Sequence, residues 1–100
     1  MKNEFNYREL DSIIHSRVRL GIMTVLITGD EVEFKFLKEK LKLSDGNLSA
    51  NMSKLENAGF VETKKFFFKK KPKTVYKITE KGRKAFKQYI ENLEKIIEKL

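Results

Sequence analysis

The chain has 100 residues, the size of one ordinary domain, and 40% of them are hydrophobic, which is enough for a single small core. It has no cysteine and one histidine, which excludes disulfides, thiolate metal sites, cysteine nucleophiles and histidine-rich metal sites, so we expect no catalysis, no metal and no cofactor. No apolar run approaches the roughly 20 residues that span a bilayer, and Met1–Tyr7 lacks the pattern of a signal peptide, so we expect a cytoplasmic protein without a membrane partner.

The charge is unevenly distributed along the chain. The net charge is +8, yet residues 1–50 hold eight basic and eight acidic side chains, so the whole excess lies in residues 51–100. Residues 61–90 contain 11 lysines and arginines against two glutamates. A compact positive region indicates an anionic partner, with nucleic acid first and an anionic membrane surface second. The alternative is a solvated surface in a lysine-rich proteome.

The first quarter of the chain predicts a helix. Ser16 is a suitable N-cap, because a serine hydroxyl accepts a hydrogen bond from a free backbone N–H of the first turn. Apolar residues between Val18 and Ile27 supply a broad hydrophobic face, and Gly29 with Asp30 ends the helix.

Residues 32–59 predict a short strand and two more helices. An extended residue pair leads into a two-turn helix from about Phe34 to Leu41. Leu43 then lies in a three-residue connection. Ser44 is the expected N-cap of the next helix, which ends at Ala58-Gly59.

Residues 61–78 predict a β-hairpin. Two runs of β-branched and aromatic residues flank the lysine cluster Lys69–Lys73. Proline cannot donate to a strand ladder, so we expect Pro72 at the tip. Thr79 is the expected N-cap of a last helix that can run to Leu100. The order helix, short strand, helix, helix, strand, strand, long helix defines an α+β, mostly helical fold.

A helix, a tight turn and a helix, followed at once by a hairpin with a basic tip, form the architecture of a winged helix-turn-helix. Four stretches make this specific: His15-Ser16-Arg17-Val18-Arg19-Leu20, Leu43-Ser44-Asp45-Gly46-Asn47-Leu48-Ser49, Lys54-Leu55-Glu56-Asn57-Ala58-Gly59-Phe60-Val61 and Pro72-Lys73-Thr74-Val75-Tyr76-Lys77-Ile78-Thr79-Glu80-Lys81-Gly82-Arg83. Over about Leu10 to Ile90 the chain resembles the small prokaryotic winged-helix transcriptional regulators related to the MarR and ArsR families.

The resemblance implies a homodimer that binds double-stranded operator DNA. We expect a single winged-helix domain over residues 1–100, with its core at 10–78 and a dimerisation helix at 79–100. Relatives in the ArsR group sense metals through cysteine or histidine clusters. This chain has no such cluster, so that mode of sensing is not carried over.

The helix after Ser44 is the candidate DNA-reading helix. At 100° per residue, Leu48, Met52 and Leu55 share the face that packs on the preceding helices. The other face carries small and polar residues that can enter the major groove, where asparagine can pair with adenine and an alanine methyl can touch thymine. The alternative is an ordinary solvated face. The candidate DNA-binding residues here are Ser44, Gly46, Asn47, Ala50, Ser53 and Lys54.

Relatives often have an arginine on this face, whereas this chain has Ala50 near its centre. We therefore expect modest base specificity, much of it through DNA shape and phosphate contacts.

The wing supplies further candidate DNA-binding residues. Lysine point charges suit phosphates, so we expect phosphate contacts from Lys69, Lys70, Lys71 and Lys73. The three consecutive phenylalanines Phe66–Phe68 cannot all point inward, because successive side chains of a strand alternate faces. We expect the extra aromatic ring to pack against the last helix; the alternative is stacking on bases or insertion into DNA.

The last helix carries an apolar seam with heptad spacing. One domain core cannot easily cover a stripe that reaches the last residue, so we expect a C2 dimer. The alternatives are a helix folded back on its own domain and a helix on a membrane surface. The candidate interface residues are Phe86, Tyr89, Ile90, Leu93, Ile96, Ile97 and Leu100.

The remaining polar residues near the N-terminus give no catalytic pattern. His15 precedes a helix N-cap, where we expect a structural role and not a pH switch. Glu4, Glu9 and Asp11 are scattered along what we expect to be a mobile terminus, and they do not form an acid-base pair.

The sequence therefore predicts a DNA-binding transcriptional regulator that binds its operator as a homodimer. Two alternatives use the same features. One is a non-specific nucleic-acid or chromatin-associated protein, and the other is a winged-helix module that binds a partner protein.

Overall fold

The computed structural model describes residues 6–100, and its elements follow the order expected from the sequence. A short 3-10 turn, η1 (Tyr7–Glu9), precedes α1 (Arg17–Leu26), α2 (Phe34–Leu41) and α3 (Asp45–Asn57). Strands β1 (Val32–Glu33), β2 (Val61–Phe68) and β3 (Lys71–Ile78) form an antiparallel sheet in the order β1-β3-β2, and α4 (Glu80–Ile97) ends the fold. The expected α+β, mostly helical winged-helix fold is confirmed.

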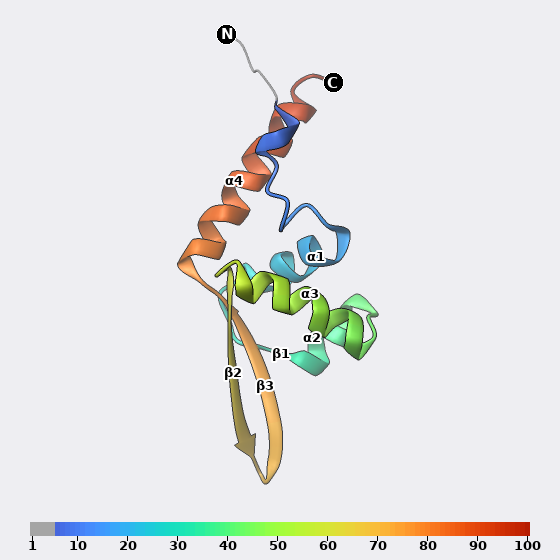
Figure 1. The fold of residues 1–100 in the computed structure, drawn as a ribbon, viewed down its shortest axis with the longest axis vertical. Helices are drawn as coiled ribbons and strands as arrows, with labels where there is room; N and C mark the ends of the chain where they lie inside the picture. Colours follow the sequence, from blue (N-terminus) through green and yellow to red (C-terminus); the bar gives the residue numbers. More distant parts are fainter. Residues whose placement is uncertain (1–5) are drawn as a thin grey trace.

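The molecule is elongated, with principal extents of 59 × 25 × 21 Å. Helices α1, α2 and α3 lie beside its middle, while the hairpin and α4 leave this helical part in opposite directions (Figure 1). The hairpin of β2, β3 and the turn between them is called the wing below. Because the wing projects from the core, most of its side chains meet solvent.

Each of the three expected N-caps is confirmed by a hydrogen bond from the first helical turn. The hydroxyl of Ser16 accepts from Arg19 N at 3.3 Å, that of Ser44 from Asn47 N at 3.1 Å, and that of Thr79 from Gly82 N at 2.9 Å. Each cap satisfies a backbone donor that has no partner inside its helix and contributes about 1 kcal/mol. The starts of the helices are thus set by local chemistry.

The core lies between the three short helices and the base of the sheet. Helix α3 contributes Leu48, Met52 and Leu55, the face expected from their spacing, and all three side chains are buried. They pack with apolar residues of α1, α2 and the two long strands. The other buried members of this cluster are Ile14, Ile22, Met23, Leu26, Leu37, Phe60, Val61, Tyr76, Ile78 and Tyr89.

The connection between α2 and α3 holds the two helices at a fixed angle. Lys42 ends α2 in the left-handed conformation, with φ 56°, and Leu43 N donates to Lys38 O at 3.0 Å. Across the turn, Lys38 Nζ lies 2.8 Å from Asp45 Oδ1. The Asp45 carboxylate raises the pKa of Lys38 through this hydrogen bond and its charge. The expected three-residue connection is therefore confirmed as residues 42–44.

Pro72 lies within β3, where it pairs with Phe67, and not at the tip as expected from the sequence. The turn consists of Lys69 and Lys70, both with positive φ, 51° and 65°, which makes it a two-residue turn of type I′. Phe68 and Lys71 close this turn, so the next pair, Phe67 and Pro72, occupies a non-hydrogen-bonded position of the ladder. The missing N–H of proline therefore costs the β2–β3 ladder no hydrogen bond.

Helix α4 begins in close contact with the start of the wing. A Cβ atom on Gly82 would lie 2.9 Å from the carbonyl carbon of Phe60, so only glycine allows this approach. Beside it, Thr79 N donates to Phe60 O at 3.0 Å, and Thr79 Oγ1 donates to Gly59 O at 2.6 Å. The helix ends at Ile97 and not at Leu100, whose side chain is fully exposed.

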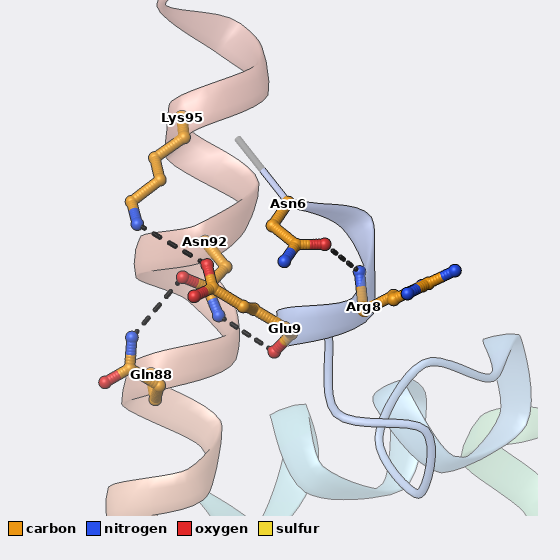
Figure 2. Close-up of polar contacts among 6 residues, drawn as sticks. All are labelled: Asn6, Arg8, Glu9, Gln88, Asn92 and Lys95. Carbon is orange, nitrogen blue, oxygen red and sulfur yellow. Dashed lines mark hydrogen bonds and ion pairs between the residues drawn. The ribbon is translucent and has the colours of Figure 1, made fainter. Parts of the chain in front are cut away.

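The segment before α1 is fixed to α4, so the part of the terminus that the structure describes is not the mobile segment expected from the sequence (Figure 2). The buried Asn92 side chain donates to Glu9 O at 3.0 Å, and Lys95 Nζ lies 4.0 Å from the Glu9 carboxylate. The Asp11 carboxylate accepts from the backbone N–H of Ile13 and Ile14, at 2.8 and 3.1 Å. Glu4 lies outside the described residues.

His15 joins this segment to α4 by a second contact, in agreement with the expected structural role. Its Nδ1 lies 2.8 Å from the hydroxyl of Tyr89. Tyr89 is 3% exposed, and burial raises its pKa. The N-terminal segment thus covers one side of α4 along about two turns.

Gly82→Ala should destabilise the protein, because the new methyl group would overlap the Phe60 carbonyl. Overpacking of this kind costs about 1–3 kcal/mol. Gly46→Ala is the matched control, since nothing lies within 4 Å of a Cβ atom there, and it should leave stability unchanged or raise it by up to about 1 kcal/mol. Chemical denaturation of both variants measures the difference. A Gly82→Ala protein as stable as Gly46→Ala would contradict the close approach.

Lys69→Asn combined with Lys70→Gly should stabilise the wing turn. A residue other than glycine, asparagine or aspartate in the left-handed region costs about 1–2 kcal/mol, and Asn-Gly adopts a type I′ turn readily. We expect the free energy of unfolding to rise by about 1–2 kcal/mol, which thermal unfolding at fixed protein concentration detects. Lys71→Asn, in the neighbouring strand, should bring no such gain. An equal melting temperature for the double variant and the wild type would argue against strain in the turn.

Candidate nucleic-acid interface

The outer face of α3 is solvent-exposed and consists of small and polar side chains. It lies opposite the buried residues Leu48, Met52 and Leu55, as their helical spacing requires. The small side chains of this face allow the helix backbone to approach another molecule closely. The structure places the six candidate residues on this exposed side or at the N-terminal end of the helix: Ser44, Gly46, Asn47, Ala50, Ser53 and Lys54.

A chain of hydrogen bonds from α1 reaches this face. Arg19 Nη1 donates to Asn51 Oδ1 at 2.8 Å, and Asn51 Nδ2 donates to Asn47 Oδ1 at 2.6 Å and to Asn47 O at 2.9 Å. The Arg19 guanidinium is itself held by a hydrogen bond from Nε to the backbone oxygen of Ile13. Two side chains that the sequence analysis did not single out, Arg19 and Asn51, therefore fix the position of Asn47.

The direction of these hydrogen bonds sets the orientation of the Asn47 amide. Arginine has only donors, so Asn51 must turn its oxygen toward Arg19 and its NH2 group toward Asn47. Asn47 must then turn its oxygen toward Asn51. Its NH2 group has no hydrogen-bond partner among the described residues and faces away from Asn51. The outer face of α3 thus presents an oriented hydrogen-bond donor.

The sequence contains one signal for this arrangement. Asn47 and Asn51 stand four residues apart, which places them side by side on a helix. Arg19 is separated from Asn51 by 32 residues, so no local pattern connects the two.

The lysines of the wing fall into two groups. Farther from the turn, Lys73 Nζ lies 3.0 Å from the Glu33 carboxylate, and Lys64 Nζ lies 3.6 Å from that of Glu31. Three candidate residues at the tip, Lys69, Lys70 and Lys71, form no ion pair among the described residues, and neither do Lys65 and Lys77. Three of these five unpaired lysines therefore lie at the tip of the wing, while candidate Lys73 is already paired.

None of the three wing phenylalanines packs against the last helix, in contrast to the sequence-based expectation. The wing points away from α4 (Figure 1), and Phe66, Phe67 and Phe68 are 38%, 77% and 54% exposed. The ammonium groups of Lys64 and Lys69 lie over the rings of Phe66 and Phe68, at 5.8 and 5.4 Å. The sequence pattern required at least one exposed ring, and the length of the wing exposes all three.

The wing and α3 are joined at the base of the sheet. Thr63 of β2 donates a hydrogen bond through its hydroxyl to the Glu56 carboxylate of α3. On the same face of the sheet, Tyr76 is buried and its ring lies 6.4 Å from that of Phe34 in α2. Burial, and secondarily the charge of Glu56, raises the pKa of Tyr76. These contacts set the direction of the wing relative to the outer face of α3.

The apolar side chains of α4 form an arc around the helix. The rest of the chain covers one part of this arc, and the other part is exposed to solvent. Tyr89 is buried against the protomer's own N-terminal segment, as is Asn92. Four other apolar residues of α4 are half-buried: Ala85, Phe86, Leu93 and Ile96. Along the opposite edge of the arc, Ile90 and Ile97 are 36% and 64% exposed, and Leu100 beyond the helix end is fully exposed. The candidate interface residues thus fall partly inside the protomer and partly on its surface.

Two other kinds of feature are absent from the described part of the chain. Residues 6–100 contain no group of three or more histidine, cysteine, aspartate or glutamate side chains able to hold a metal ion. None of their helices has both the length and the apolar character needed to cross a bilayer.

The sequence matches the family model of the winged helix DNA-binding domain over residues 18–97. An uncharacterized protein of Methanocaldococcus jannaschii is 54% identical over 78 residues, which are 78% of this chain and 85% of that protein. A transcriptional regulator homologue from Pyrococcus horikoshii has a similar structure, with a TM-score of 0.84, 32% identity and 92% of both chains covered. Diamide-treated YodB from B. subtilis gives a TM-score of 0.71 at 27% identity, over 80% of this chain and 78% of that one.

The matched residues run from α1 to the end of α4 and include the helix-turn-helix, the wing and the last helix. Three of the four stretches that carried the resemblance to MarR and ArsR regulators lie wholly within them. The solved relatives agree in fold over nearly the same length. The chain therefore belongs to the winged helix DNA-binding domain family, and its fold is that of the MarR-like transcriptional regulators.

Proposed function

We propose that this chain is a non-enzymatic, cytoplasmic transcriptional regulator that binds operator DNA as a homodimer. In this proposal the winged-helix core of residues 10–78 contacts DNA and residues 79–100 form the dimerisation arm. The observation that carries the proposal is the oriented Asn47 amide on the outer face of α3, beside a wing whose tip lysines are unpaired.

Helix α3 lies in the major groove and supplies the sequence preference. Asn47 presents an NH2 donor, because its oxygen is occupied by Asn51. In the major groove a donor matches the acceptor atoms of guanine, adenine N7 or thymine O4, and it opposes the N4 amino group of cytosine. Ala50 and Ser53 contribute small surfaces that let the backbone approach the bases. A base contact of this kind is worth about 1–3 kcal/mol of discrimination.

The wing lies on the adjacent DNA backbone and supplies affinity. Lys69, Lys70 and Lys71 have no anionic partner within the described chain and are free to neutralise phosphates. Lys73 contacts a phosphate only by leaving Glu33, so it contributes less than the three tip lysines. Each neutralised phosphate lowers the slope of log K against log salt by about 0.9.

Homodimerisation uses the uncovered edge of the α4 arc. Ile90 and Ile97 are exposed in the protomer, and the half-buried Phe86 and Leu93 lie beside them on the helix. Residues 90, 93, 97 and 100 repeat at steps of three and four, which is the spacing of a helix-helix seam. Tyr89 and Ile96 lie toward the covered side and support the seam from within each protomer. A two-fold dimer places half-sites about 34 Å apart.

Wing and helix substitutions should have opposite effects on specificity. Operator sequences are first selected from random duplex DNA. Asn47→Asp replaces the outward donor by an acceptor, so it should weaken the selected site relative to random DNA by about 1–3 kcal/mol. Lys69→Ala, Lys70→Ala and Lys71→Ala combined should weaken both DNAs by similar factors and reduce the salt slope by about 2–3 units. Binding titrations at 50–200 mM salt measure both effects.

Lys73→Ala is the matched control for the wing, since this lysine is paired with Glu33. It should change affinity and salt slope less than any one of the three tip lysines. Equal binding of wild type to selected and random DNA would instead indicate a non-specific nucleic-acid protein. Absence of DNA binding at 50 mM salt would favour a protein-interaction module.

Ile90→Glu combined with Ile97→Glu should convert the dimer to a monomer, because the interface would bury unpaired carboxylates. Both side chains are exposed in the protomer, so the variant should fold normally. Light scattering at micromolar concentration should give twice the 11.8 kDa protomer mass for the wild type and one protomer mass for the variant. Lys87→Glu, on the exposed polar face of α4, should remain dimeric. A monomeric wild type would refute the dimer.

A further inference from the structure

The tip of the wing carries an apolar cross-strand pair that the protein leaves uncovered. Phe67 and Pro72 are directly opposite each other in the β2–β3 ladder, and the Phe67 ring is 77% exposed. Side chains of a non-hydrogen-bonded antiparallel pair approach each other closely, with Cα atoms about 4.5 Å apart. The ring and the proline therefore present one continuous apolar surface.

Phe67 differs from its two neighbours. Phe66 and Phe68 point to the other face of the strand, and each lies beneath a lysine ammonium group of the same hairpin. Phe67 makes no ring or cation contact with any described residue. It follows Val61, Thr63 and Lys65 along the face of β2 that, nearer the core, is covered by helices. Phe67 is the member of this face that lies beyond the helices.

The backbone holds this surface in a fixed position. The β2–β3 ladder has eight residue pairs and closes in a two-residue turn, so Phe67 stands one pair from the turn without a flexible loop. The positive φ angles of Lys69 and Lys70 place two lysines at the extreme end, where a type I′ turn ordinarily has Asn-Gly. The turn thus carries two positive charges at the cost of some backbone strain.

Charge identifies the class of surface that covers Phe67. Lys65 precedes it on the same face, Lys69 and Lys70 form the turn beyond it, and Lys71 lies on the other face opposite Phe68, all without an ion pair among the described residues. An exposed apolar ring framed by cations fits a narrow groove between two rows of anions. The minor groove of duplex DNA is such a groove, and proteins that bind it insert Phe, Leu, Ile, Met or Pro between base steps.

We propose that Phe67, supported by Pro72, inserts from the minor groove between two base pairs next to the α3 half-site, partly unstacks them and bends the DNA. This inference rests on the proposed function and adds that binding deforms the operator. The tip lysines hold the two phosphate backbones beside the inserted ring. Pyrimidine–purine steps unstack most easily, so selected operators should contain such a step at the wing position of each half-site.

The test measures DNA bending separately from DNA binding. A duplex carrying the selected operator is labelled at both ends for energy transfer, and 2-aminopurine is placed at the step under the wing. Wild type should shorten the end-to-end distance and raise 2-aminopurine fluorescence. Phe67→Ala should still bind, with affinity lower by on the order of 10-fold, and should lose both signals. Phe67→Leu should retain them, because leucine also serves as an apolar wedge.

Phe66→Ala is the matched control, since its ring lies on the other face of β2 beneath Lys64. It should bend DNA as the wild type does. If wild type binds without bending, or Phe67→Ala bends DNA equally, the wedge is wrong and the proposed function stands. If wild type binds no duplex, the proposed function fails as well.

Two further measurements address other occupants of the same surface. In sedimentation with phosphatidylserine–phosphatidylcholine vesicles at 150 mM salt, wild type and Phe67→Ala should both stay in solution. In light scattering, both should have the same mass. Vesicle binding that depends on Phe67 would assign the ring to a membrane surface, and loss of the dimer in Phe67→Ala would assign it to a second copy. Either result would overturn the proposal.

Discussion

The backbone of Phe60 is the point on which the arrangement of the whole molecule depends. Its N–H donates to Leu55 O near the end of α3, its carbonyl accepts from Thr79 N, and Gly82 of α4 lies against it. Helix α3, both strands of the wing and α4 therefore meet within a few ångströms. Because backbone groups make these contacts, the angle between α3 and the wing is rigid, and a side chain at Gly82 would move α4. A regulator that must place a helix and a wing on one duplex requires this kind of fixed junction.

Local preferences are violated mainly at the surfaces assigned to DNA. Lys69 and Lys70 adopt the left-handed conformation, which glycine adopts most easily, and the three phenylalanines of the wing are exposed to solvent. The left-handed conformation costs stability in the free protein, and the exposed rings contribute little because folding does not bury them. The core shows no such conflict, since its helix caps, buried leucines and strand pairs all agree with the sequence pattern. Outside the wing, Lys42 is also left-handed and Phe36 is also exposed, but the wing holds most of these conflicts. Conflict concentrated in one projecting element is the pattern expected of a binding surface.

The parts that could be predicted from sequence were those decided by local chemistry. Serine and threonine caps, the inner face of α3 and the three-residue connection depend on neighbours within one or two turns, and all of them are confirmed. The parts that could not be predicted depend on side chains distant in sequence, such as Arg19 with Asn51 or Glu33 with Lys73. Pro72 was misplaced because the rule against proline in a ladder does not apply at a non-hydrogen-bonded pair. The N-terminal segment was misjudged because its anchor, Asn92, lies 83 residues away.

Distant contacts of the same kind connect α4, the proposed dimerisation arm, to α3, the proposed reading helix. Tyr89 of α4 bonds to His15, whose backbone N–H donates to Asp11 O at 2.7 Å, and Ser16 then caps α1. Arg19, in the first turn of α1, bonds back to Ile13 O and forward to Asn51, which orients Asn47. The last two links each have one allowed direction, because arginine only donates and thereby fixes which way the Asn51 amide faces. In the proposed complex, the α4 arm and the Asn47 donor are therefore joined through one set of polar contacts at the start of α1.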